Sequence, residues 1–207
     1  MKNYLLLPVL VLFLMDGINA QERFELKNPS FEEDKPEVGI VPEGWLNMGA
    51  PGETPPDIQP GFFEVYLKAQ HGKSYLGLAT RDNNTWEGVG QRLDGFLQKD
   101  SSYTFSLYLA RSNSFISISR TTQKEASYSA PTILKIWGVN SLTQQEQLLA
   151  ESVPVSHSEW TRYTFTLKPT VADFDEIDLM AYYAPGFEQK NGNLLIDNCS
   201  AIVKITE

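Results

Sequence analysis

The sequence is poor in the residue types that most often carry out chemistry. It has one cysteine, Cys199, and two histidines, His71 and His157. A single cysteine cannot form a disulfide within the chain, and two isolated histidines do not make a zinc signature. The sequence contains no GxSxG nucleophile motif and no glycine-rich phosphate loop. It therefore predicts a protein that is not an enzyme, in which Cys199 is a small core residue.

Basic residues and long hydrophobic segments are also scarce. Seventeen lysines and arginines against 26 acidic residues leave a net charge of −9. An acidic surface repels the phosphates of nucleic acids, so we expect no nucleic-acid partner. Beyond the first 20 residues, no apolar run approaches the length of about 20 residues that a membrane-spanning helix needs.

The first 20 residues have the pattern of a signal peptide. Lys2 gives a positive start, an apolar run extends from Leu5 to Met15, and Ala20 supplies the small residue needed for cleavage. We expect residues 21–207 to be exported without a transmembrane segment, and to be periplasmic, at the cell surface or secreted. Their length and aromatic content suit a single domain with a sizeable core.

Prolines, by contrast, are concentrated in one segment. Half of the 12 prolines lie between residues 33 and 61, interleaved with glycines. Because proline donates no backbone hydrogen bond, it cannot occupy a central strand. The segment is therefore expected to be a long loop across the domain, held to the core by Trp45. Long loops are often functional, so we expect it to form one wall of a ligand site.

Much of the remaining chain has the two-residue period of β-strands. The expected strands are 62–67, 74–80, 87–93, 103–110, 132–139, 160–167, 176–183 and 193–205. The segment 103–110 alternates most clearly and should bury Phe105, Leu107 and Leu109 on one face. Residues 112–130 suggest a hairpin or surface loop, and residues 144–149 a short helical turn. Roughly nine or ten strands separated by turns predict an all-β antiparallel sandwich.

The two ends of residues 21–207 carry a matched pair of motifs. Residues 28–32 read NPSFE and residues 194–198 read LLIDN. On an all-β chain, these motifs resemble those of the galactose-binding-domain-like jelly roll, in which the first and last strands are adjacent. Many non-catalytic carbohydrate-binding modules of secreted bacterial proteins have this fold. Residues 71–93, HGKSYLGLATRDNNTWEGVGQRL, also resemble a stretch in the amino-terminal domains of some outer-membrane-protein-A-like envelope proteins.

The same resemblance implies a structural calcium ion. In related modules, an early glutamate and a late aspartate help to hold calcium, and the matching residues here are Glu32 and Asp197. Carbonyl groups near Lys73 and Ser74 are expected to add ligands, because calcium takes six to eight oxygens. The alternative is that both carboxylates close the edge of the sandwich through hydrogen bonds.

A ligand site is expected in the loop from Arg81 to Glu87. Sugar recognition needs a flat ring beside a few placed polar groups, and this loop offers Arg81, Asp82, Asn83 and Trp86. The alternative is a plain turn in which Trp86 folds back onto the core.

Further candidates are aromatic residues that alternate against core positions. Tyr108 should point away from the core on its strand, as Tyr182 and Trp137 should on theirs. We expect Tyr108, Arg111 and Tyr182 on one open sheet face, where glycan chains often lie. Packing at the core or edge is the alternative for each aromatic residue.

These observations predict a secreted, non-catalytic carbohydrate-binding module that binds a glycan or cell-surface polysaccharide at the bacterial cell envelope. An envelope structural or adhesion protein, which uses the same fold to contact another protein, is the alternative. A glycoside hydrolase is less favoured. The acidic clusters at 32–34 and 173–176 offer paired carboxylates for it, but such clusters usually form solvated surface.

Overall fold

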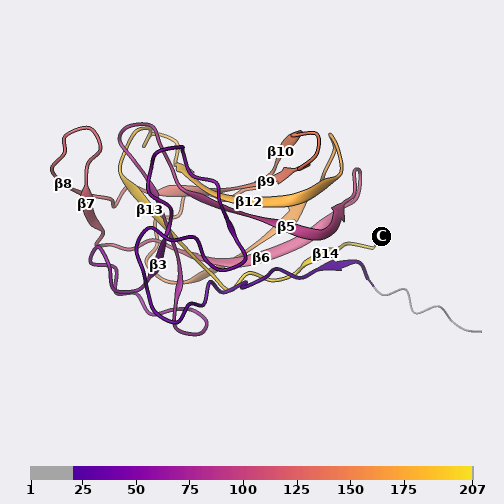
Figure 1. Cartoon of the computed structure of the whole chain (residues 1–207), viewed down its shortest axis with the longest axis horizontal. Coiled ribbons are helices and arrows are strands. Elements are labelled where there is room, and N and C mark those ends of the chain that lie inside the picture. Colours follow the sequence, from indigo (N-terminus) through magenta and orange to yellow (C-terminus); the bar gives the residue numbers. More distant parts are fainter. Residues whose placement is uncertain (1–20, 207) are drawn as a thin grey trace, which may run out of the picture.

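The computed structural model describes residues 21–206, and the expected signal peptide, residues 1–20, lies outside them. Every regular element within 21–206 is a β-strand. Two sheets stack as layers, and a separate two-stranded hairpin projects from one end (Figure 1). Among the described residues there is no helix of the length and apolar character needed to cross a membrane.

The first layer is a seven-stranded antiparallel sheet. Its path is β1 (Arg23–Phe24), β14 (Ile202–Lys204), β6 (Tyr103–Ala110), β13 (Gly192–Asp197), β4 (Tyr75–Thr80) and β3 (Asp57–Gln59), with β11 (Thr161–Leu167) also paired to β6. Phe24 of β1 lies opposite Ile202 of β14. The predicted adjacency of the first and last strands is therefore confirmed.

The second layer is a five-stranded antiparallel sheet. Its order is β10 (Glu146–Glu151), β9 (Thr132–Val139), β12 (Phe174–Tyr183), β5 (Gly88–Leu97) and β2 (Leu46–Asn47). The remaining hairpin joins β7 (Ile116–Ile118) to β8 (Glu125–Ser127). The predicted all-β antiparallel sandwich is confirmed, and β9 coincides with the segment expected from its apolar run.

The main core lies between the two layers. Phe105, Leu107 and Leu109 of β6 are buried there, as predicted, against Leu134 and Ile136 of β9. Cys199 is also a buried member of this cluster, which confirms its assignment as a core residue. Because strand residues alternate between faces, the residues between these positions point to the outer sides of the sheets.

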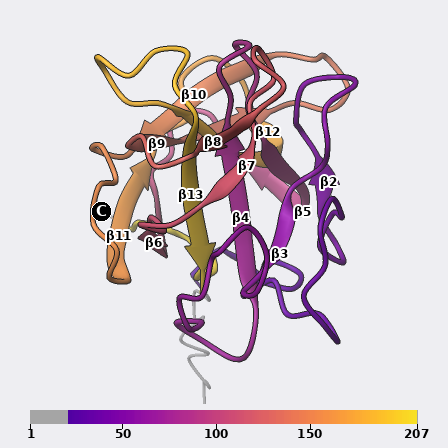
Figure 2. The ribbon, with the colours of Figure 1, turned by 90° about the vertical axis from the view of Figure 1, so that its left-hand side faces the viewer.

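The outer face of the seven-stranded sheet is covered at its centre by a second apolar cluster. Tyr75, Ala79 and Leu195 face outward from β4 and β13 and pack against Phe115 and Tyr128 of the hairpin segment. Figure 2 shows β7 and β8 passing in front of β4 and β13. Because this cluster covers the centre of that face, the outer side of the five-stranded sheet is the broad sheet face that it leaves uncovered.

Two local predictions were wrong. Residues 62–67 form a turn rather than a strand, and Phe63 and Glu64 have positive φ angles of 54° and 63°. Residues 146–151 form β10, not a helical turn, because pairing with β9 outweighs the local helical preference of the glutamines.

The proline-rich segment 33–61 contains only the short strands β2 and β3. Trp45 is 6% exposed and packs against Phe31, with ring centroids 5.1 Å apart. Its indole Nε1 donates a hydrogen bond to the carbonyl of Asn28 at 3.1 Å. The prediction that Trp45 holds this loop to the core is confirmed.

Candidate functional site

Arg81 points into the protein, not toward solvent. Its side chain is 4% exposed, its guanidinium pairs with Glu87, and its Nε lies 3.6 Å from an oxygen of Glu53. It also donates a hydrogen bond to Thr54 at 2.9 Å. The expectation that Arg81 and Trp86 present one combined surface is therefore wrong, because the arginine turns inward at the end of β4.

Asp82 and Asn83 are engaged within the protein. The carboxylate of Asp82 accepts hydrogen bonds from the hydroxyl of Ser119 at 2.6 Å and the amide of Arg120 at 3.0 Å. Asn83 donates to Glu53 at 2.7 Å. These contacts tie the turn to the β7–β8 hairpin and to the proline-rich loop, which explains the polar character of the turn without a ligand.

Trp86 lies on the five-stranded sheet instead. Its ring is half-buried and stacks on Tyr182 of β12, with centroids 4.3 Å apart. The ammonium of Lys135, on β9, lies 4.2 Å from the centroid of the Tyr182 ring. Two aromatic rings and one cation thus meet at one end of this sheet, an arrangement that favours stacking with a further flat or apolar surface.

Tyr108 and Arg111 lie away from Tyr182. Tyr108 is on β6, in register with Arg162 and Asp197 of the seven-stranded sheet, whereas Tyr182 is on β12 of the other sheet. Arg111 donates to the carbonyl of Ser129 and to Asn113, so it holds the base of the hairpin segment. The expectation that Tyr108, Arg111 and Tyr182 share a face is wrong.

The outer face of the five-stranded sheet carries two unsatisfied polar groups in register. Asp178 of β12 lies opposite Trp137 of β9 on one side and Gly90 of β5 on the other. Asp178 is 4% exposed, yet its Oδ1 has no hydrogen-bond partner among the described residues, and neither has Nε1 of Trp137. A buried polar atom left unpaired costs free energy, so such atoms in a folded protein need an explanation.

Gly90 makes room for the carboxyl group. A Cβ built at this glycine would lie 2.4 Å from Oδ1 of Asp178 and 3.0 Å from the side chain of Met48. Burial, together with the charges of Glu176 and Glu146, raises the pKa of Asp178 to about 7. The site thus holds a carboxyl group that is partly protonated at neutral pH, beside an indole donor.

Sequence reasoning placed Trp137 on this face but missed Asp178. The available signal was an aspartate at the centre of the apolar strand 174–183, where an unpaired charge is costly.

Glu32 and Asp197 both bind the loop that joins them, residues 70–74. Oδ2 of Asp197 accepts the amides of Gln70 and His71 at 2.8 and 2.9 Å, and Glu32 accepts the amide of Lys73 at 3.0 Å. Burial and the charge of Glu32 raise the pKa of Asp197 to about 6, although backbone hydrogen bonds to the carboxylate lower it.

This arrangement agrees with the hydrogen-bonding alternative. The loop presents N–H groups where calcium needs carbonyl oxygens, and the described residues contain no cluster of three or more potential metal ligands. Calcium binding stays a prediction.

No protein-family model matches the chain, and no curated protein matches it. Solved structures match it in fold. A Stig cyclase, FisC from Fischerella sp. TAU, crystallised with (3Z)-3-(1-methyl-2-pyrrolidinylidene)-3H-indole, gives a TM-score of 0.60 at 14% identity, covering 91% of this chain and 100% of the cyclase. The CBM22-1 xylan-binding domain of Xyn10C from Paenibacillus barcinonensis gives 0.52 at 18% identity, covering 91% and 97%. The chain has the galactose-binding-domain-like jelly-roll fold.

At these identities the likeness shows the fold alone. The same jelly roll occurs in a xylan-binding domain and in a cyclase, so the fold by itself does not decide between binding and catalysis. The side chains on the two sheet faces therefore determine the function.

Proposed function

We propose that this protein is a non-catalytic glycan-binding module and that the outer face of the five-stranded sheet is its binding surface. The observation that carries the proposal is the pair of unsatisfied groups on that face, Asp178 Oδ1 and Trp137 Nε1. A sugar hydroxyl both donates and accepts hydrogen bonds. Both atoms are buried in the free protein, so a glycan reaches them only when neighbouring side chains such as Met48 move aside. Its hydroxyl groups then satisfy the carboxyl oxygen and the indole N–H.

The aromatic groups on this face supply the apolar part of the contact. Trp86 and Tyr182 are stacked at one end of β12, and Trp137 lies beside Asp178 nearer its middle. From Glu176 to Tyr182 the outward positions extend about 20 Å at roughly 3.3 Å per residue. A surface of this length suits a run of several sugar units better than a single one.

The negative charge of the protein limits the class of glycan that it can bind. The net charge of −9 and the carboxyl groups of Glu176 and Asp178 disfavour polyanionic chains. We propose a neutral polysaccharide of the cell surface or its surroundings, reached after export through the signal-like residues 1–20. A xylan-binding domain of the same fold supports this class of ligand.

The proposal is tested by screening residues 21–207 on a glycan array and titrating each hit by calorimetry. Micromolar to millimolar dissociation constants are expected, because the surface offers few polar contacts. Trp137→Ala should weaken binding at least tenfold, whereas Tyr66→Ala, which removes a 73% exposed ring elsewhere, should leave it unchanged. Binding that is insensitive to Trp137→Ala would contradict the proposed surface.

If no glycan binds, the envelope structural or adhesion role takes its place, with protein as the partner. Purified outer-surface proteins retained by immobilised residues 21–207 would then support it, provided that Trp137→Ala abolishes the retention.

A second candidate function is acid catalysis by Asp178. With a pKa of about 7, its buried carboxyl group holds a proton at neutral pH that it can donate to a substrate as a general acid. The indole ligand of the Fischerella cyclase is a suitable probe, with tryptophan fluorescence as the readout. Quenching that disappears in Trp137→Phe would favour an apolar substrate over a glycan.

A further inference from the structure

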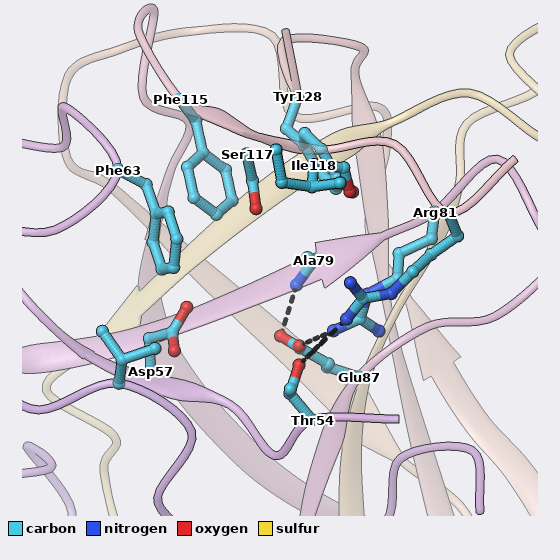
Figure 3. A pocket seen from close by; sticks show the side chains of 12 residues that line it. Thr54, Asp57, Phe63, Ala79, Arg81, Glu87, Phe115, Ser117, Ile118 and Tyr128 are labelled. Carbon is cyan, nitrogen blue, oxygen red and sulfur yellow. Dashed lines mark hydrogen bonds and ion pairs between the residues drawn. The ribbon is translucent and has the colours of Figure 1, made fainter. Parts of the chain in front are cut away.

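A separate cavity of about 170 Å³ is lined by both ends of the Arg81–Glu87 loop. It is bounded by β3, β4, the proline-rich loop and the β7–β8 hairpin (Figure 3). Val38, Thr54 and Asp57 of the proline-rich loop line it, so that loop forms one wall of a cavity, as expected from its composition. The cavity is on the seven-stranded sheet, so it is distinct from the surface described above.

One side of the cavity carries buried charged groups. Arg81 is 3% exposed, and its Nη1 has no hydrogen-bond partner among the described residues, although its other nitrogens contact Glu87, Glu53 and Thr54. Both oxygens of Glu87 are used, by Arg81 and by the amide of Ala79. Arg81, which lines the cavity, therefore holds one buried N–H donor without a partner.

Asp57 brings an acceptor to the same side. It is 7% exposed, and its Oδ1 accepts a hydrogen bond from the amide of Gly39 at 2.9 Å. Figure 3 shows its carboxylate below the ring of Phe63, with Glu87 and Arg81 further along the cavity. Asp57 and Arg81 thus both line the cavity and offer it a carboxylate and a guanidinium group.

The opposite side consists of aromatic rings. Phe63 and Phe115 meet at a centroid distance of 5.2 Å, and Phe115 and Tyr128 at 5.3 Å. The hydroxyl of Tyr128 donates to the carbonyl of Ile118 at 2.7 Å, so its polar end is satisfied within the hairpin. The rings present apolar faces and edges, and Figure 3 shows Phe63 and Phe115 across the cavity from Glu87.

The charge balance disfavours ionic ligands. Burial raises the pKa of Glu87 to about 8 and that of Asp57 to about 6, so at neutral pH the charges of Asp57 and Glu53 balance those of Arg81 and Arg120. The site therefore has no excess positive charge that would favour an anion. A cationic amine satisfies Asp57 but leaves the N–H of Arg81 unpaired and brings a like charge beside it. A neutral hydroxylated ligand pairs with both groups and places its apolar face on the rings.

We propose that this cavity is a second binding site, which takes a single neutral sugar ring, either a free monosaccharide or the terminal unit of a glycan. Its volume is below the range of about 300–1,000 Å³ typical of sites for drug-sized ligands, which limits the occupant to one ring. The proposal shares its ligand class with the proposed function but not its surface, so each can fail alone.

The test is an amide NMR titration of residues 21–207 with D-glucose, D-galactose, D-mannose, D-xylose, L-arabinose and N-acetylglucosamine, each taken into the millimolar range. The amides of Gly39 and Ala79 bond to Asp57 and Glu87, so they report the cavity directly. At least one sugar should move both resonances along a saturating curve, and Trp137→Ala should leave that curve unchanged.

A cavity-filling variant separates binding from stability. Ser117→Leu places an apolar side chain in the cavity without removing a core group, and Ser127→Leu, at an exposed position on the other strand of the hairpin, is its matched control. Ser117→Leu should lower the affinity for the monosaccharide at least tenfold, and Ser127→Leu should leave that affinity unchanged. Equal binding by both variants, or no movement at Gly39 and Ala79 with any sugar, would overturn the proposal. Movement confined to β9 and β12 would overturn it while supporting the first surface.

Discussion

The outer face of the seven-stranded sheet is covered at its centre by Phe115, Tyr128 and their neighbours, whereas the outer face of the five-stranded sheet keeps Asp178 and Trp137 without partners. The two faces also treat a buried carboxyl group differently. Glu87 is paired with Arg81 and with a backbone amide, but Asp178 has no cation beside it. The contacts of Glu87 are those that a buried structural charge needs. Asp178 has an unsatisfied oxygen, which a ligand can supply with a hydrogen bond.

The largest loss of stability is expected when the buried Arg81 loses its partner Glu87. Glu87→Ala leaves Arg81 buried without its nearest counter-charge and should lower the free energy of unfolding by about 3–5 kcal/mol. Urea unfolding measures the change. Glu22→Ala, which removes the surface pair with Lys204, is the control and should cost less than about 1 kcal/mol. Equal losses in both variants would remove the distinction between buried and surface pairs.

A calcium ion held by Glu32 and Asp197 would add a metal at the end of β13, a central strand of the seven-stranded sheet. If the ion binds, adding calcium to chelator-treated protein at 100 times its dissociation constant stabilises the fold by about 2.7 kcal/mol. The expected result is a higher melting temperature that Glu32→Gln abolishes. An unchanged melting temperature would support the alternative that backbone amides alone satisfy the two carboxylates.

Asp178 should instead destabilise the fold once it is ionised. Its folded pKa of about 7 lies above its ordinary value of 3.8, so the native state holds the proton more tightly than the unfolded state. Its contribution to stability is fully present below about pH 4 and is lost as the pH rises to about 7. At about 1.4 kcal/mol per pKa unit, Asp178→Asn should therefore stabilise the protein by about 4 kcal/mol at pH 8 relative to pH 4.

The measurement is the difference in melting curves between Asp178→Asn and the unmodified protein across that range of pH. A constant difference from pH 4 to pH 8 would show that the carboxyl group has an ordinary pKa. Asp94→Asn, at an exposed position on β5, is the matched control.

Trp86→Ala should have the smallest effect on stability. The ring is half-buried and stacks on Tyr182, so its loss is expected to cost about 1 kcal/mol. Glycan affinity should nevertheless fall at least tenfold, because the platform at that end of the sheet is removed. Calorimetry and thermal melting on the same sample separate the two effects. A stability loss of 3–5 kcal/mol would instead identify Trp86 as a core residue.

Alternation along single strands predicted much of this fold. The buried positions of β6 and the outward positions of Tyr108, Trp137 and Tyr182 follow from the two-residue period alone. That period does not say which sheet a strand joins, and so Tyr108 and Tyr182 were wrongly placed on one face. Arg81 was missed as a buried residue because its counter-charges, Glu53 and Glu87, are brought to it only by folding.

Glycan binding by the outer face of the five-stranded sheet is tested most directly by NMR. The tryptophan indole N–H resonances are titrated with neutral oligosaccharides of xylose, glucose, mannose and galactose. Trp45 and Trp160 are internal controls, because their indoles already donate to the carbonyls of Asn28 and Lys68. The account predicts that at least one oligosaccharide shifts the indole resonance of Trp137, with a smaller shift at Trp86, and leaves Trp45 and Trp160 in place. A bound oligosaccharide that leaves the Trp137 resonance unmoved would contradict it.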